Sequence, residues 1–182
     1  EIMPSLVGSE MCIRDSDDAL AERIRALGNY GSDYKYHHVY KGQNSRLDEL
    51  QAAFLAAKLP HLDAMNAERR RIAARYLAEM HNPAVTLPAE LPDCTHVWHI
   101  FAVRCADRNA LEKHLNARGI GTNKHYPTPI HLQGAYAELG LGRGALPLAE
   151  EISATELSLP MFYGMTDAQV QAVIDAVNEF EG

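Results

Sequence analysis

Apolar residues recur every three to four positions in six stretches of the chain, which is the period of an amphipathic helix. In the second stretch, four apolar residues are expected to face inward, namely Leu47, Leu50, Phe54 and Leu55. In the third, the basic triplet Arg69–Arg71 is expected on or near the solvated side. The predicted helices are Asp17–Leu27, Ser45–Lys58, His61–Met80, Arg108–Arg118, Leu148–Thr155 and Thr166–Phe180.

Three shorter apolar segments have the composition of strands, at Val97–Cys105, Ile120–Asn123 and Leu157–Leu159. Gly119 marks the end of the helix before the second of them, and residues 83–93 read as a proline-rich linker. Helices and strands in this order predict an α/β fold, with an α+β small domain built on a mostly antiparallel sheet.

Composition narrows the class of protein. The 182 residues are 47 % hydrophobic and 23 % charged, which is ordinary for a globular chain. A net charge of −7 argues against a nucleic-acid partner, and no apolar run approaches the ~20 residues of a membrane helix. Cysteines at 12, 94 and 105 lack a paired short spacing, so reduced thiols in a cytoplasmic protein are expected.

The most informative junction is the start of the second predicted helix, after a polar loop rich in tyrosine and histidine. Ser45 is expected to cap that helix, with Asp48 as its reciprocal partner. Asn44 and Arg46 flank the cap, where free backbone N–H groups and the helix dipole favour a phosphate or carboxylate.

Histidines offer a second group of candidates. His125 and His131 flank a proline-stiffened loop, but neither a third ligand at a suitable spacing nor an HExxH pattern accompanies them, so no metal site is expected. His99 is expected to pack within a strand, and Trp98 is assigned to the core.

Several ordered runs carry a family resemblance. They are Tyr34-Lys35-Tyr36-His37-His38, Gly42 to Ala53, His96 to Phe101, Gly119 to Thr122 with His125-Tyr126-Pro127, and Leu157 to Met161. Together they resemble the DegT/StrS-type nucleotide-sugar aminotransferases over residues 17–180. The resemblance implies a pyridoxal-phosphate (PLP) enzyme of the aspartate-aminotransferase fold, which works as a homodimer with shared active sites.

The resemblance also implies roles for single residues. Asn44 corresponds to the asparagine that reaches the cofactor phosphate of the partner subunit. Arg46 would pair with the diphosphate of the substrate, and a salt bridge to Asp48 or Glu49 is an equal alternative.

Two further residues are implied to contact the substrate. His125 would donate a hydrogen bond to the sugar nucleotide, although a structural histidine that satisfies loop carbonyls remains an alternative. Tyr36 would line the same site, and its alternative is to cover a helix pair.

By the same resemblance, residues 17–60 would be part of a large PLP-binding domain, 61–82 an interdomain helix and 83–182 the small domain. Residues 1–16 match nothing in the family and are interpreted as a foreign-looking or unstructured start. The family's spacing implies that the lysine that binds the cofactor covalently lies at or before the first residues, where none is present. The first lysine of the chain is Lys35, so no catalytic residue is assigned.

The implied reaction moves an amino group from glutamate to a keto-deoxy sugar on a nucleoside diphosphate. With no assigned lysine, the chain is expected to be a C-terminal fragment that is inactive alone. The alternatives are a non-catalytic interaction or dimerisation module, and a PLP-dependent sugar dehydratase of the same family.

Overall fold

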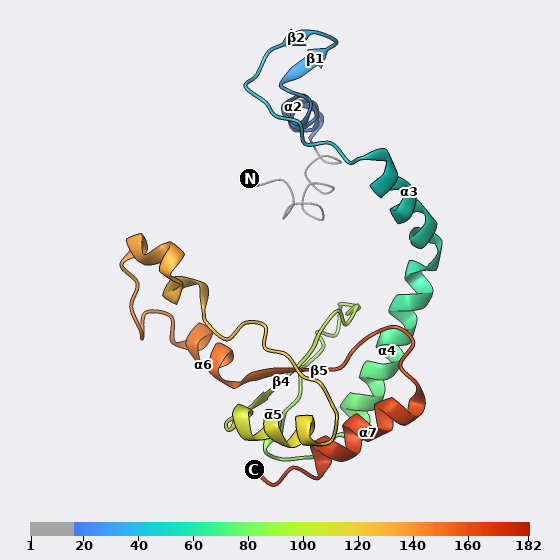
Figure 1. Ribbon diagram of the computed structural model, residues 1–182, viewed down its shortest axis with the longest axis vertical. Coiled ribbons are helices and arrows are strands. Elements are labelled where there is room, and N and C mark those ends of the chain that lie inside the picture. Colours follow the sequence, from blue (N-terminus) through green and yellow to red (C-terminus); the bar gives the residue numbers. More distant parts are fainter. Residues whose placement is uncertain (1–16) are drawn as a thin grey trace. The chain divides into compact units, whose positions relative to one another are not determined.

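The computed structural model describes residues 17–182 (Figure 1), and the prediction about the start of the chain falls on residues 1–16, outside them. The chain forms two compact units, the first ending at Pro60 and the second running from His61 to Gly182. Within the described residues, no helix has both the length and the apolar character needed to cross a membrane.

The first unit contains helix α2 (Asp18–Gly28), the short antiparallel strands β1 (Ser32–Tyr34) and β2 (His37–His38), and helix α3 (Glu49–Lys58). The predicted first helix is confirmed, and Asp17 caps it by accepting the Leu20 N–H at 2.9 Å. A 3-10 turn, η2 (Leu59–His61), follows α3.

Helix α3 begins four residues later than predicted. The Ser45 N–H donates to the Gly28 carbonyl at 2.8 Å, which ties Ser45 to the end of α2 and keeps it out of the cap position. Asp48 stands at the N-cap instead and makes no side-chain cap bond. The predicted capping box is therefore wrong.

The prediction that one face of α3 points inward is also wrong for this chain. The helix buries no residue. Its apolar side chains, and the one just before it, each keep more than half of their surface exposed: Leu47, Leu50, Phe54 and Leu55.

The second unit is built on the three-stranded sheet β3-β4-β5, made of Val85–Thr86, Phe101–Cys105 and Glu156–Leu159. Both pairings are antiparallel, with Val103 opposite Leu157, as the mostly antiparallel prediction required. The helices of this unit are α4 (Leu62–Glu79), α5 (Arg108–Ala117), α6 (Pro147–Thr155) and α7 (Asp167–Asn178), with 3-10 turns η3 (Ile130–Leu132) and η4 (Gly134–Leu139) before α6.

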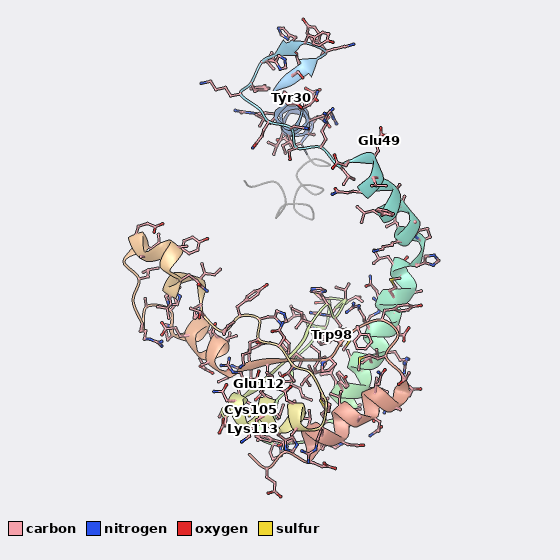
Figure 2. The ribbon with its side chains drawn as sticks, in the orientation of Figure 1. Tyr30, Glu49, Trp98, Cys105, Glu112 and Lys113 are labelled. Carbon is pink, nitrogen blue, oxygen red and sulfur yellow. The ribbon has the colours of Figure 1, made fainter. Side chains whose placement is uncertain are left out.

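The hydrophobic core of the second unit lies between the sheet and its helices. Helix α5 contacts β4 and β5, and α7 contacts both α4 and α5 (Figure 1). Phe101 of β4 is completely buried, with its ring centroid 5.0 Å from that of Tyr76 and 5.2 Å from that of Trp98. Trp98, labelled in Figure 2, is 2 % exposed, which confirms its assignment to the core.

Two strand predictions and the linker prediction need correction. Strand β4 begins at Phe101 and not at Val97, because Trp98 has a left-handed backbone (φ +51°) that breaks an extended run, and His99 is exposed outside the strand. The stretch Ile120–Asn123 forms only an isolated bridge from Asn123 to Ser158. The predicted linker 83–93 contains β3.

The expectation that Arg69 lies on or near the solvated side of α4 is wrong, because its side chain is partly buried against backbone carbonyls. Its Nη1 donates to the carbonyl of Met161 at 3.0 Å, and to those of Trp98 and His99 at 3.3 and 3.4 Å. Two turns further along α4, the Tyr76 hydroxyl donates to the Pro160 carbonyl at 3.0 Å. Burial raises the pKa of Tyr76, so this hydroxyl stays a donor. Helix α4 thus holds the turn after β5 in place.

Thr166 caps α7 as predicted, and it does so in a reciprocal pair. Its Oγ1 accepts the Gln169 N–H at 3.2 Å, and the Gln169 side chain accepts the Thr166 N–H at 2.9 Å.

Replacing Thr166 with alanine is expected to lower the free energy of unfolding by about 1 kcal/mol, because one end of α7 loses its side-chain acceptor. Urea unfolding followed by circular dichroism measures the change. Thr166→Ser is the matched control, since it keeps the oxygen, and equal stability of the Ala and Ser variants would contradict the capping role.

Candidate functional site

The candidate residues fall into two separate places, one in each unit. Asn44, Arg46 and Tyr36 belong to the first unit, and His125 belongs to the second.

The loop that carries Asn44 is clamped against the end of α2. The Tyr30 N–H donates to the Gln43 carbonyl at 3.0 Å, the Gln43 N–H donates to the Leu27 carbonyl at 3.0 Å, and Asn44 bridges to Asn29. Two glycines allow the loop backbone to come this close to the end of α2. A Cβ on Gly31 would lie 1.9 Å from the backbone carbonyl oxygen of Tyr40, and one on Gly42 would lie 2.2 Å from the backbone nitrogen of Gly31. The backbone of Asn44 is therefore held without the help of its side chain.

Arg46 and Asn44 contact each other directly. The Arg46 Nε donates to the Asn44 Oδ1 at 3.0 Å, and the Arg46 guanidinium lies 5.8 Å from the centroid of the Tyr30 ring. Within residues 17–182, the alternative salt bridge to Asp48 or Glu49 is not formed. Because the oxygen of the Asn44 amide is engaged, its nitrogen remains to donate, beside a guanidinium. Both side chains are exposed, and together they suit an anion.

Tyr36 lies on the turn between β1 and β2, in a left-handed backbone conformation (φ +68°), and 85 % of its surface is exposed. The Lys35 Nζ lies 5.1 Å from the centroid of its ring. Nearby, the His37 Nδ1 lies 2.7 Å from the Asp33 Oδ1, and this hydrogen bond lowers the pKa of Asp33. Tyr36 does not cover a helix pair, so that alternative is wrong for this chain.

His125 borders a pocket of about 250 Å³ at the end of β5, which Asn123, Ser158 and Pro160 also line. Its backbone N–H donates to the Glu156 Oε2 at 2.8 Å, and its ring Nδ1 lies 2.8 Å from the Ser158 Oγ. The alternative of a histidine that satisfies loop carbonyls does not describe these contacts, since the ring meets side chains.

His131 has a different environment. It is buried, and its Nε2 lies 3.1 Å from the Glu150 Oε1 of α6, an atom that also accepts the Gly144 N–H at 2.8 Å. Burial alone would raise the pKa of Glu150, but the hydrogen bonds from Gly144 and His131 lower it overall. His131 therefore fastens the segment before α6, and it lies apart from the pocket beside His125.

Sequence reasoning missed Glu156 and Ser158 as site residues. They stand two positions apart in β5, so they share one face of the strand, while Leu157 and Leu159 share the other. The signal in the sequence is a pair of polar residues at alternate positions of a short strand. Because all four residues of β5 are buried, these polar side chains need hydrogen-bond partners.

Comparison with known proteins shows the family of the chain. Residues 11–178 match the model of the DegT/DnrJ/EryC1/StrS aminotransferase family. The chain is 49 % identical over 156 residues to the erythromycin biosynthesis sensory transduction protein EryC1 of Saccharopolyspora erythraea, covering 85 % of this chain and 43 % of the relative. It is 49 % identical over 165 residues to dTDP-3-amino-3,4,6-trideoxy-alpha-D-glucose transaminase of Streptomyces venezuelae, covering 90 % and 44 %.

Solved structures agree with these relatives. The structure of DesV from S. venezuelae in complex with a ketimine intermediate superposes with a TM-score of 0.86 at 49 % identity, over 90 % of this chain and 44 % of that one. A DegT DnrJ EryC1 StrS aminotransferase from Brucella abortus gives a TM-score of 0.84 at 32 % identity, over 91 % and 44 %. The fold is thus that of the PLP aminotransferases.

The chain belongs to the DegT/DnrJ/EryC1/StrS aminotransferase family. It spans about 44 % of the length of the relatives that it matches.

Proposed function

We propose that this chain is the C-terminal part of an aminotransferase that moves an amino group from glutamate to a keto-deoxy sugar on a nucleoside diphosphate. The observation that carries the proposal is the 49 % identity to a dTDP-sugar transaminase over 165 residues, together with a TM-score of 0.86 to the solved DesV structure. In this reading residues 17–60 belong to the large PLP-binding domain, 61–82 to an interdomain helix and 83–182 to the small domain.

Pyridoxal phosphate is the cofactor that we propose, and the donors in the first unit fit its phosphate. The Asn44 amide nitrogen is free to donate, while Arg46 occupies the amide oxygen and adds a positive charge. Asn44 would reach the phosphate held mainly by the partner subunit of a cytoplasmic homodimer, and Arg46 would reach the substrate diphosphate. Bound PLP supplies the electron-withdrawing ring that makes exchange of an amino group feasible.

Two further residues are proposed to contact the substrate. Tyr36 is exposed on a short turn and can offer its ring or hydroxyl to the nucleotide sugar. His125 is fixed by Glu156 and Ser158 beside a pocket, which suits a residue that orients a sugar.

The chain alone is proposed to be inactive. Lys35 and Lys41, the first lysines of the sequence, are both exposed in the segment between α2 and α3, and neither is assigned as the amine that would bind the cofactor.

The test compares two purified proteins: the chain itself, and the complete product of the gene that encodes it, read from the source DNA. Each is incubated with PLP, glutamate and a dTDP-linked 3-keto sugar, and release of 2-oxoglutarate is measured. We expect turnover by the complete product and none above background by the chain.

Other outcomes favour other functions. Loss of water from the sugar without consumption of glutamate would replace the proposal with a dehydratase. A complete product that has no lysine before Asp17 and no activity would replace it with a non-catalytic interaction module. Turnover by the chain alone would overturn the inactivity that we propose for it.

A further inference from the structure

Two buried polar residues of β5 form a hydrogen-bonded chain that ends on the ring of His125. Glu156 and Ser158 are each only 5 % exposed, and they share one face of the strand. Polar groups at such depth are costly unless each finds a partner, so their contacts determine how the neighbouring ring is held.

The direction of the hydrogen bonds follows from the number of protons available. The Ser158 hydroxyl has one proton, and it donates this proton to the Glu156 Oε1. The other carboxylate oxygen accepts the backbone N–H of His125 at 2.8 Å. The Ser158 oxygen can therefore only accept from the ring Nδ1 of His125, which lies 2.8 Å away. The proton of the ring must sit on Nδ1.

The other side of the ring leads to the same assignment by an independent route. The Oδ1 of Asn123 accepts the Lys124 N–H at 2.8 Å, and this contact fixes which way the amide points. The Nδ2 of Asn123 then faces the His125 Nε2 at 3.2 Å and donates to it. An Nε2 that accepts a hydrogen bond from an amide N–H must be unprotonated and use its lone pair.

We propose that Glu156 and Ser158 are positioning residues that hold His125 as its Nδ1–H tautomer, so that Nε2 presents a lone pair to the pocket. Without a ligand, the Asn123 amide occupies this lone pair, and a ligand that displaces the amide must carry a hydroxyl or another donor at that point. The family resemblance had implied that His125 donates. The choice of ligand group rests on the proposed function, whereas the tautomer does not.

The reverse tautomer is incompatible with the contacts on both sides. A ring with its proton on Nε2 would need Ser158 to donate to Nδ1, which requires a protonated Glu156 to donate to Ser158. It would also set an N–H of the ring against the amide N–H of Asn123, unless that amide turned over and left the Lys124 N–H without its acceptor.

The ring nitrogens can be observed directly. The chain is labelled with ¹⁵N-histidine, and long-range proton–nitrogen correlation spectra are recorded in mildly alkaline buffer without any ligand. His125→Gln identifies the signals of His125 among those of the nine histidines. We expect Nδ1 to show the ¹⁵N chemical shift of a protonated ring nitrogen and Nε2 to show that of an unprotonated one.

Variants separate positioning from general stability. Ser158→Ala should shift most of the population to the Nε2–H form, because the Nδ1–H loses its buried acceptor while the exposed Asn123 amide can turn away. Ser158→Thr should restore the Nδ1–H form, and Asn123→Ala should leave it in place. Thr155→Ala, which removes an exposed hydroxyl next to β5, is the matched control and should change nothing.

An Nε2–H ring in the unmodified chain would overturn the proposal, even if Ser158→Ala fails to fold. So would an unchanged Nδ1–H ring in a folded Ser158→Ala variant. Because no ligand is present, a failure here is distinct from failure of the aminotransferase assay.

Discussion

Replacing Phe101 with alanine is expected to lower the free energy of unfolding of the second unit by about 3–5 kcal/mol. The ring is completely buried between Tyr76 and Trp98, so its removal leaves a cavity lined by two other aromatic rings. Urea unfolding of the whole chain measures the effect. Far-UV circular dichroism is the primary signal, and the emission of Trp98, the single tryptophan, is the second.

Phe162→Ala is the matched control for that experiment. The same side chain is removed, but Phe162 is 46 % exposed, so a loss near 0.5 kcal/mol is expected. A loss below about 1 kcal/mol for Phe101→Ala would show that the core does not depend on this aromatic group.

Replacing Arg69 with alanine is expected to cost about 2–3 kcal/mol, the largest effect of any exchange of a charged residue on α4. The guanidinium donates to the carbonyls of Trp98, His99 and Met161, and these lose a charged donor when it is removed. The same urea unfolding experiment measures the change. Arg69→Lys should recover part of it, since an ammonium group can replace some of the three contacts.

Arg71 is the control for Arg69, two positions further along the helix. It pairs with Asp167 at 2.8 Å, but both side chains are largely exposed, so Arg71→Ala should cost less than about 1 kcal/mol. Equal losses at positions 69 and 71 would mean that the basic triplet is a uniform solvated face.

These two arginines illustrate what the sequence can predict. Periodicity and capping signals identified α2, α5, α7 and the Thr166 cap, because these depend on neighbours within a few residues. The contacts of Arg69 were not predicted, since they join α4 to carbonyls that lie 29, 30 and 92 positions away. Helical periodicity places Arg69 three residues before Ile72 and seven before Tyr76, on the buried side of α4, but it cannot identify the carbonyls that the guanidinium contacts.

The same difference between local signals and long-range contacts applies to the candidate site. Asn44, Arg46, Tyr36 and His125 were proposed from local motifs, and their roles remain predictions. Local motifs could not predict which hydrogen bonds the His125 ring makes, because Ser158 lies 33 positions further along the chain. The start of α3 was misplaced for a similar reason. Ser45 has a side chain that suits a helix cap, but its backbone N–H donates to the carbonyl of Gly28 at the end of α2.

The exposed apolar surface of α3 has a practical consequence. A helix of 10 residues that buries none of them gains almost nothing from packing, and an isolated helix of that length is only marginally stable in water. The helicity of residues 49–58 in the chain by itself should therefore fade gradually on warming, without the sharp transition of a cooperative unit. The rate of backbone amide hydrogen exchange in this segment would therefore report whether α3 is covered. Exchange should be fast when α3 is exposed to solvent and slow once another protein surface packs on Leu50, Phe54 and Leu55.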